Sequence, residues 1–165
     1  MLNVKKSLLM LVFVMALAVS CGGTKKKNAK GEDPNLAGQN QALELNADSD
    51  SGTFGKLKTV YFPFNSATLR ESTRKVLDEN SEYLKTNGTL SIQVEGHCDE
   101  RGGVQFNLAL GEKRSQTIKN YLIASGIDAN RVTTISFGKE RPVAVGHDEV
   151  AWSKNRRGNF VLTAK

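Results

Sequence analysis

The sequence predicts a two-layer α/β sandwich for the part of the chain after residue 55. Short apolar runs that alternate with polar residues, or that are rich in β-branched and aromatic residues, are typical of half-buried strands. Between them lie longer stretches with the 3.6-residue apolar period of helices, and Gly or Pro separates most of the segments. The resulting order, βαβαβ followed by one more strand, predicts a sheet packed against helices.

The first strand is expected at residues 58–64, where Pro63 would end the extended run. Ser66 or Ser72 is expected to cap the helix that follows, which continues to about residue 87 and stops at Gly88. The side chains that this helix should bury are Leu69, Val76, Leu77, Tyr83 and Leu84.

The second half of the domain repeats this order. An alternating run predicts the next strand, a long periodic stretch closed by Gly126 predicts a helix, and apolar positions spaced by two predict the later strands. The expected elements are strand 90–96, helix 104–125, strand 131–137, a short helical turn at 149–154 and strand 158–163.

The amino terminus has the pattern of a bacterial lipoprotein precursor. Two lysines precede the apolar run 8–19, which is too short for a comfortable membrane span and is followed by Ser20 and Cys21. Residues 1–20 are therefore predicted to be a signal peptide, and Cys21 to become the first mature residue, carrying the lipid. The alternative is an ordinary cleaved secretory signal with an incidental cysteine.

Residues 21–55 are predicted to form a flexible tether, because they are rich in Gly, Asn, Lys, Asp and Ser and poor in large apolar residues. Such a segment has a root-mean-square span of roughly 30 Å and an extended limit of roughly 110 Å. Gly22, rather than Asp, follows the cysteine. The resemblance to sorted lipoproteins implies delivery to the outer membrane.

The segment 95–114, EGHCDERGGVQFNLALGEKR, holds the candidate site. Asp99 lies just beyond a predicted strand end, and glycines supply the turn before the long helix. Asn107, Leu110 and Arg114 are spaced by three, four and seven positions, so they share one helix face. Arg114 is expected to point back towards Asp99 across a shallow groove, which suits a zwitterionic ligand.

These residues resemble the OmpA-like peptidoglycan-binding domain family, and within it the peptidoglycan-associated lipoproteins (Pal). The resemblance implies a mixed four-stranded sheet with both long helices on one face. The matching motifs are Gly96-His97-Cys98-Asp99, Asn107 and Leu110-Gly111-Glu112-Lys113-Arg114, with further matches at 60–62, 66–69, 138–142 and 155–157.

The resemblance also implies recognition of diaminopimelate, the cross-linking residue of the peptidoglycan stem peptide, by Asp99 and Arg114. Diaminopimelate carries an ammonium and a carboxylate on one side-chain carbon, which an Asp and the planar fork of an Arg complement. Lysine lacks that carboxylate, so it would leave the guanidinium unpaired at a cost of about 1–3 kcal/mol.

The remaining candidate ligand residues are Phe62, Arg101, Asn107 and Leu110. Phe62 is expected in the core together with Phe64, at a strand end that borders the groove in the family. Arg101 either contacts a second carboxylate or is solvated. Asn107 is expected to hold the loop through backbone hydrogen bonds in preference to contacting the ligand.

Several other residues bear on the site. Pro63 and Asn65 stand where the family commonly has Asp, so a contact to the ligand is in doubt there. Cys98, in place of the usual Thr, is expected to be a small buried residue without a redox role. His97 is interpreted as a structural imidazole, and the arginines at 156 and 157 as partners of surface acids.

The predicted function is that of a binding module, not an enzyme, and no cofactor or metal is expected. A wall hydrolase is disfavoured because the chain has only 2 His and 2 Cys and no zinc-ligand spacing or nucleophile elbow. The net charge of +6 is compatible with an anionic polymer, or with solubility alone. The resemblance implies peptidoglycan, the outer membrane and a TolB-like protein as partners, in the Tol-Pal system. The alternative is a structural lipoprotein without a Tol-Pal role or with weakened wall binding.

Overall fold

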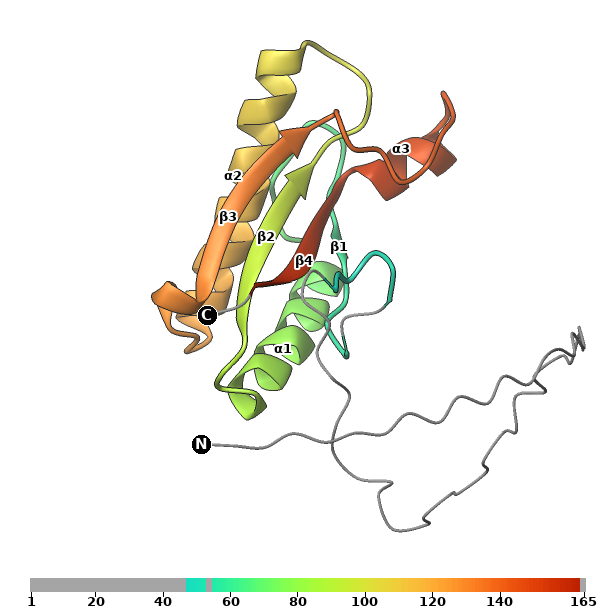
Figure 1. Cartoon of the computed structure of the whole chain (residues 1–165). Coiled ribbons are helices and arrows are strands. Elements are labelled where there is room, and N and C mark those ends of the chain that lie inside the picture. The colour runs from blue at the N-terminus through green and yellow to red at the C-terminus, as the bar shows by residue number, and fades with distance from the viewer. Residues whose placement is uncertain (1–46, 53–54, 164–165) are drawn as a thin grey trace, which may run out of the picture. The chain divides into compact units, whose positions relative to one another are not determined.

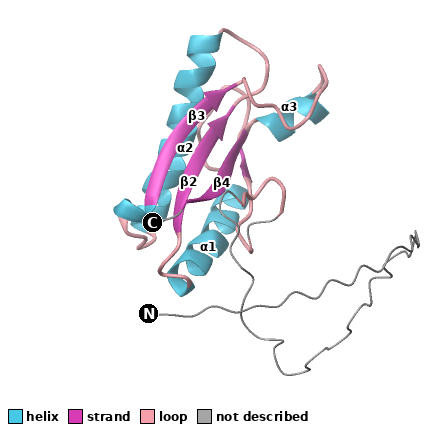
Figure 2. Cartoon of the chain, viewed as in Figure 1, coloured by secondary structure: helices cyan, strands magenta, loops and turns pink. Residues whose placement is uncertain are grey.

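The computed structural model describes residues 47–52 and 55–163 (Figures 1 and 2). Within them the elements occur in the predicted order, with each main helix and strand close to its expected place. They are β1 (Val60–Tyr61), α1 (Glu71–Thr86), β2 (Ser91–His97), α2 (Val104–Ala124), the 3₁₀ turn η1 (Ala129–Arg131), β3 (Val132–Gly138), α3 (Glu149–Asn155) and β4 (Arg157–Thr163).

The strands form one four-stranded sheet in the order β1-β4-β2-β3. β2 and β3 run parallel and are joined by the crossover helix α2, whereas β4 is antiparallel to both β1 and β2. The sheet is therefore mixed, as the resemblance implies. Figure 1 shows α2 running behind β2 and β3, and α3 next to the start of β4.

One apolar core lies between the sheet and the two long helices. It contains Leu77 and Leu84 of α1 and Ile118 and Leu122 of α2, which pack with the same face of the strands. The strand side chains in this core include Val60, Ile92, Val94, Val132, Phe160 and Leu162. The predicted two-layer sandwich with both long helices on one face is confirmed.

A contact between two glycines brings α2 close to β2. A β-carbon added to Gly96 would overlap the carbonyl group of Gly111, and one added to Gly111 would overlap the hydroxyl of Ser136 on β3. The helix backbone therefore rests directly on the strands, where any side chain would push it away. This contact fixes the position of Arg114, which is one turn beyond Gly111 on the same helix.

The segment before α1 differs from expectation. β1 ends at Tyr61, so the predicted strand 58–64 is too long, although the amide of Phe62 still donates to the carbonyl of Arg156 at 2.8 Å. Neither predicted serine caps the helix: α1 begins after Arg70, which makes no side-chain cap hydrogen bond. Ser66 Oγ instead accepts from the amide of Thr68 at 3.0 Å, within the loop.

The folded part begins before the expected boundary at residue 56. Asp48 forms a β-bridge with Val161, and the amide of Ser49 donates to the carbonyl of Phe160 at 2.9 Å. The signal peptide, Cys21 and the tether before residue 47 lie outside the described residues. Within residues 47–52 and 55–163, no helix has the length and apolar character needed to cross a bilayer.

Candidate ligand-binding site

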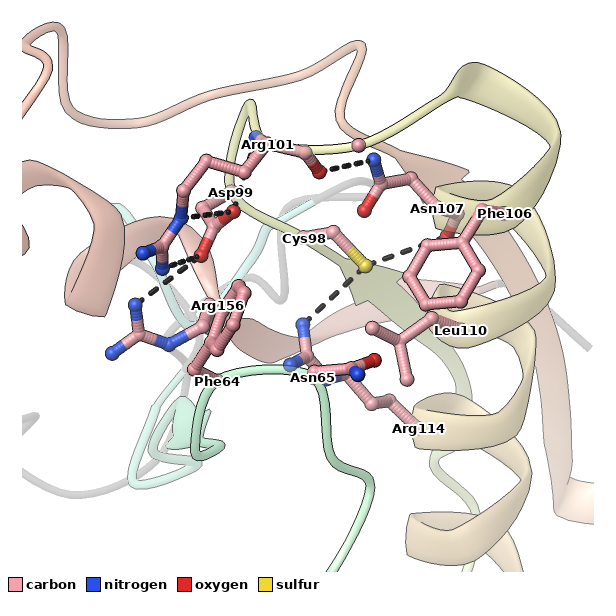
Figure 3. A pocket seen from close by; sticks show the side chains of 11 residues that line it. Phe64, Asn65, Cys98, Asp99, Arg101, Phe106, Asn107, Leu110, Arg114 and Arg156 are labelled. Carbon is pink, nitrogen blue, oxygen red and sulfur yellow. Dashed lines mark hydrogen bonds and ion pairs between the residues drawn. The ribbon is translucent and has the colours of Figure 1, made fainter.

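A small cleft opens where the 63–66 loop, the 98–103 loop, α2 and Arg156, between α3 and β4, meet (Figure 3). Its volume is about 110 Å³. This is below the range of about 300–1,000 Å³ that is usual for drug-sized ligands, so the cleft matches a compact head group. The residues that line it are Phe64, Asn65, Cys98, Asp99, Arg101, Gly102, Phe106, Asn107, Leu110, Arg114 and Arg156.

Asp99 is the one carboxylate among the residues that line the cleft, and it is 3% exposed. Arg101 donates to it through Nε at 3.2 Å and Nη2 at 2.7 Å, and Arg156 Nη1 donates at 3.2 Å. Burial raises the pKa of Asp99, but the hydrogen bonds from the two arginines outweigh it and hold the pKa below its ordinary value. Asp99 is therefore ionised at neutral pH.

Arg114 is fully buried at the floor of the cleft. Its guanidinium donates to three carbonyl oxygens, those of Ser66 at 2.9 Å, His97 at 2.7 Å and Pro63 at 2.9 Å. None of the ion pairs among the described residues includes Arg114. Burial lowers its pKa, although Cys98 and Asp99 nearby oppose the change.

Arg101 closes one side of the cleft. Its guanidinium carbon lies 3.9 Å from the ring centre of Phe64 and 3.9 Å from that of Trp152, so it is stacked between two aromatic rings while it holds Asp99. The hydrogen bond to Asp99 raises its pKa. The charge of Arg101 is thus paired within the domain while its side chain is 31% exposed, and a contact with a second ligand carboxylate stays a prediction.

Arg156 is buried in the cleft wall, not at the surface as predicted, and is 5% exposed. It pairs with Asp99 and with Glu149 of α3, and its Nε donates to the carbonyl of Phe62 at 3.2 Å. Three guanidinium groups, of Arg101, Arg114 and Arg156, thus line the cleft around one aspartate. Even with Glu149 counted, positive charge is in excess there.

The opposite wall is largely apolar. Leu110 and the half-exposed Phe106 line it from α2, and the thiol of Cys98 lies at its base, as Figure 3 shows. Burial raises the pKa of Cys98. Its thiol donates to the carbonyl of Asn107 at 3.4 Å, in agreement with the expected role of a small buried residue.

Asn107 and His97 have the structural roles that were expected of them. The side-chain nitrogen Nδ2 of Asn107 donates to the carbonyls of Arg101 at 2.8 Å and Gly103 at 3.2 Å, and so shapes the loop beside Asp99. His97 is buried, lies 3.3 Å from a carboxylate oxygen of Glu95 and stacks on Phe137. Asn107 also lines the cleft, whereas His97 does not.

The two phenylalanines of the expected first strand lie in different environments. Phe62 is in the core, as predicted, and does not line the cleft; the Arg114 guanidinium lies 5.2 Å from its ring centre. Phe64 is 57% exposed and lines the cleft, because β1 ends before it and the alternation no longer applies. Asn65 also lines the cleft and has a positive φ of 48°, which is uncommon outside glycine.

The family model described as the OmpA family matches residues 61–156, which contain the whole cleft. The chain belongs to the OmpA family. The peptidoglycan-associated lipoprotein of Pseudomonas aeruginosa is 38% identical over 154 residues, 89% of this chain and 90% of that protein. That of Rhizobium meliloti is 35% identical over 162 residues, 98% of this chain and 91% of its own length.

Solved structures agree with this OmpA-family fold. The crystal structure of the peptidoglycan-associated lipoprotein from Burkholderia pseudomallei is 38% identical, with a TM-score of 0.61, covering 64% of this chain and 89% of that one. The C-terminal domain of Helicobacter pylori MotB has the same TM-score of 0.61 at 17% identity, over 66% of this chain and 85% of that one, and shows the fold alone. The peptidoglycan-associated lipoproteins among these relatives are named for their association with peptidoglycan and not for a reaction.

Proposed function

We propose that this chain is a peptidoglycan-associated lipoprotein and that its cleft binds the side-chain head group of diaminopimelate. The observation that carries this proposal is Arg114, a fully buried cation without a carboxylate partner among the described residues, at the floor of a cleft that also contains Asp99. A buried charge is costly unless it is paired, so a ligand carboxylate gains most at this position.

The charges of the cleft match a zwitterion with its carboxylate innermost. Asp99 accepts four hydrogen bonds, three from Arg101 and one from Arg156, which fill the roughly four acceptor sites of an ionised carboxylate. In this proposal the ligand ammonium takes the place of one of these donors. The surplus positive charge favours the ligand carboxylate beside Arg114. A lysine side chain supplies only the ammonium, and would leave that surplus uncompensated.

Arg114 also supports the site mechanically. By binding the carbonyls of Pro63, Ser66 and His97, it joins the loop before α1 to the end of β2. In this proposal, the guanidinium forms the floor of the cleft and stabilises the ligand carboxylate through its charge and any remaining N–H group. Asp99 supplies the side of the cleft that recognises the ammonium, and Arg101 holds Asp99 in position there.

The wider function follows from the expected lipid anchor. We propose that Cys21 is acylated, that the chain is held in the outer membrane with its domain facing the periplasm, and that the tether lets the domain reach the cell wall. The names of the relatives support this role. A TolB-like partner and a contribution to envelope constriction during division belong to the same proposal. A Cys21→Ser chain should leave the membrane fraction.

The alternative, an OmpA-family lipoprotein with weakened wall binding, is favoured by one observation. Asn65 lines the cleft without a charge, at a position where a carboxylate would add a second acceptor for the ammonium. An Asn65→Asp variant decides between the two: a large gain in affinity for diaminopimelate would mean that the native cleft is weakened.

Calorimetric titration with meso-diaminopimelate, and with lysine whose α-amino and α-carboxyl groups are blocked so that it presents only its side-chain ammonium, tests the assignment. We expect binding of meso-diaminopimelate at least about tenfold tighter than that of lysine, the ratio that follows from about 1.4 kcal/mol. Asp99→Asn keeps the shape of the side chain but removes its charge, and should abolish most of the binding. Asp78→Asn, on α1 and outside the cleft, is the control.

Retention on purified cell wall should follow the same order as the calorimetric affinities. Equal retention of the native chain and the Asp99→Asn chain, with no heat from meso-diaminopimelate, would overturn the proposal. Circular dichroism of both variants shows whether the fold is intact, so that loss of binding is not confused with unfolding.

A further inference from the structure

A second, larger hollow adjoins the cleft, with a volume of about 450 Å³. The two share Asn65, Phe106 and Leu110, so the groove begins at the side chains that also line the cleft. One side of the groove is the backbone and small polar side chains of residues 65–68, and the other is α2. The groove ends beyond Lys113, at Thr117.

We propose that this groove is a second subsite, which binds the peptide that continues from the diaminopimelate residue and pairs its terminal carboxylate with Lys113. This inference rests on the proposed function of the cleft. The head group of diaminopimelate is at one end of the residue and its peptide bonds at the other, so a head group held in the cleft directs the peptide outwards, along a groove that begins there.

The dimensions of the groove suit a short peptide. A helix rises about 1.5 Å per residue, so α2 advances about 10 Å between Leu110 and Thr117. An extended peptide spans about 3.4 Å per residue, and this length therefore holds two or three residues. The volume of about 450 Å³ has room for small side chains but not for a folded partner.

The lining of the groove matches peptide chemistry. Asn65 makes no hydrogen bond through its side chain among the described residues, and it lies where the cleft and the groove meet. A carboxamide both donates and accepts, so it complements a peptide bond. Phe106 and Ala109 supply apolar contact for methyl-sized side chains on the helix side.

Arg114 holds this side of the groove in place. The carbonyls of Pro63 and Ser66, which flank Asn65 on both sides, accept hydrogen bonds from its guanidinium. Asn65 lies between these two hydrogen-bonded carbonyls and has a φ of 48°. Uncommon backbone conformations of this kind persist where the surroundings impose them, and they are concentrated at ligand sites.

Lys113 supplies the charge at the groove. It is exposed, and none of the ion pairs among the residues that the structure describes uses its ammonium group. A carboxylate at the end of a bound peptide would be its partner. Exposed ion pairs are weak and screened by salt, so the expected contribution to affinity is about two- to fivefold at low ionic strength.

The test compares three ligands by calorimetry on the full chain: free meso-diaminopimelate, a diaminopimelate-containing stem peptide with a free terminal carboxylate, and the same peptide with that terminus amidated. We expect the acid peptide to bind more tightly than free meso-diaminopimelate. Lys113→Met, which keeps a long helix-favouring side chain, should lower affinity for the acid peptide about two- to fivefold and leave the amidated peptide unchanged.

Lys119→Met, also on α2 but outside the groove, is the matched control and should bind all three ligands as the native chain does. Asn65→Ala should weaken both peptides more than it weakens free meso-diaminopimelate. If meso-diaminopimelate binds but the peptides gain nothing, or if amidation has the same effect in the native and Lys113→Met chains, the second subsite is overturned while the proposed function stands. If meso-diaminopimelate itself does not bind, the proposed function fails first.

Discussion

At the scale of single residues, the site depends on how its cations are paired. Arg101 and Arg156 are neutralised by Asp99 and Glu149, whereas Arg114 donates to three carbonyl oxygens and to the sulfur of Cys98, all of them uncharged acceptors. A guanidinium presents its N–H groups in a rigid planar fork, which can reach carbonyls on separate segments at once. The proposed binding role of Arg114 and its structural role therefore need separate measurements.

Replacing Arg114 by Lys should destabilise the domain even though the charge is kept. A single ammonium does not span the carbonyls of Pro63, Ser66 and His97, so at least one would lose its donor. We expect the free energy of unfolding in urea to fall by about 2–3 kcal/mol. Arg74→Lys, on the exposed side of α1, should change it by less than about 0.5 kcal/mol. Equal stability of the two variants would contradict the structural role.

The two histidines should titrate on opposite sides of the ordinary value. The hydrogen bond to Glu100 raises the pKa of the exposed His147. Burial lowers the pKa of His97, although its hydrogen bond to Glu95 opposes the change. Proton NMR of the imidazole resonances between pH 5 and pH 9 should therefore resolve two separate midpoints, around the usual value of about 6.5.

Glu100→Gln provides the control for this titration. It should bring the pKa of His147 down towards its ordinary value, because the carboxylate that favours the imidazolium is gone, and should leave His97 unchanged. A shift of both resonances, or of neither, would show that the Glu100 to His147 contact is not what separates them.

At the scale of secondary structure elements, the glycine contact between β2 and α2 determines where the helix face lies. Asp99 follows β2 and Arg114 belongs to α2, so the spacing of these two elements sets the width of the cleft between the two side chains. The contact leaves no room for a methyl group on either Gly96 or Gly111. The site and the core therefore share one packing constraint.

Gly96→Ala should separate α2 from β2 and weaken both stability and binding. The added β-carbon would overlap backbone atoms of Gly111, which cannot move aside as a flexible side chain can. We expect the free energy of unfolding to fall by about 3 kcal/mol, at the upper end for an overpacked core. Gly88→Ala is the control, since nothing lies within 4 Å of its added β-carbon. A Gly96→Ala domain as stable as Gly88→Ala would refute the close contact.

At the scale of the whole domain, residues 47–52 complete the fold by covering part of β4. Arg157 is 3% exposed, and its Nε donates to Asp50 at 2.6 Å. Ser49 Oγ donates to the side chain of Asn159 at 2.7 Å, which in turn donates to the buried Glu95 at 3.0 Å. The segment thus supplies the polar partners of the sheet face opposite the helices.

A chain that begins at residue 56 should be less stable than one that begins at residue 43. The shorter chain leaves the guanidinium of Arg157 without its carboxylate. Breaking a buried pair typically costs about 3–5 kcal/mol, and we expect about 3 kcal/mol here, measured as a lower urea midpoint. Asp50→Asn in the longer chain should reproduce a large part of the loss; equal midpoints for the two chain lengths would rule out this role.

The order and type of the elements followed from the sequence alone, because hydrophobic period and the glycines between segments are local signals. The presence of Asp99 and Arg114 at one cleft was also predictable, since a strand end and a helix face place them on the same side of the domain. The start of α1 was not, because Arg70 before it makes no side-chain cap hydrogen bond. The early end of β1 was not either, because aromatic residues continue the strand pattern to Phe64.

The tertiary structure alone decided how each charge is satisfied. Two examples are the position of Arg156 inside the cleft and the hydrogen bond between Arg157 and Asp50. Both depend on contacts between segments far apart in the chain, and such contacts leave no local pattern in the sequence. The same holds for the carbonyls that Arg114 binds, because backbone acceptors are present at every residue and their positions follow from packing. The sequence therefore determined which charged residues are available, and the three-dimensional packing determined which of them remain for a ligand.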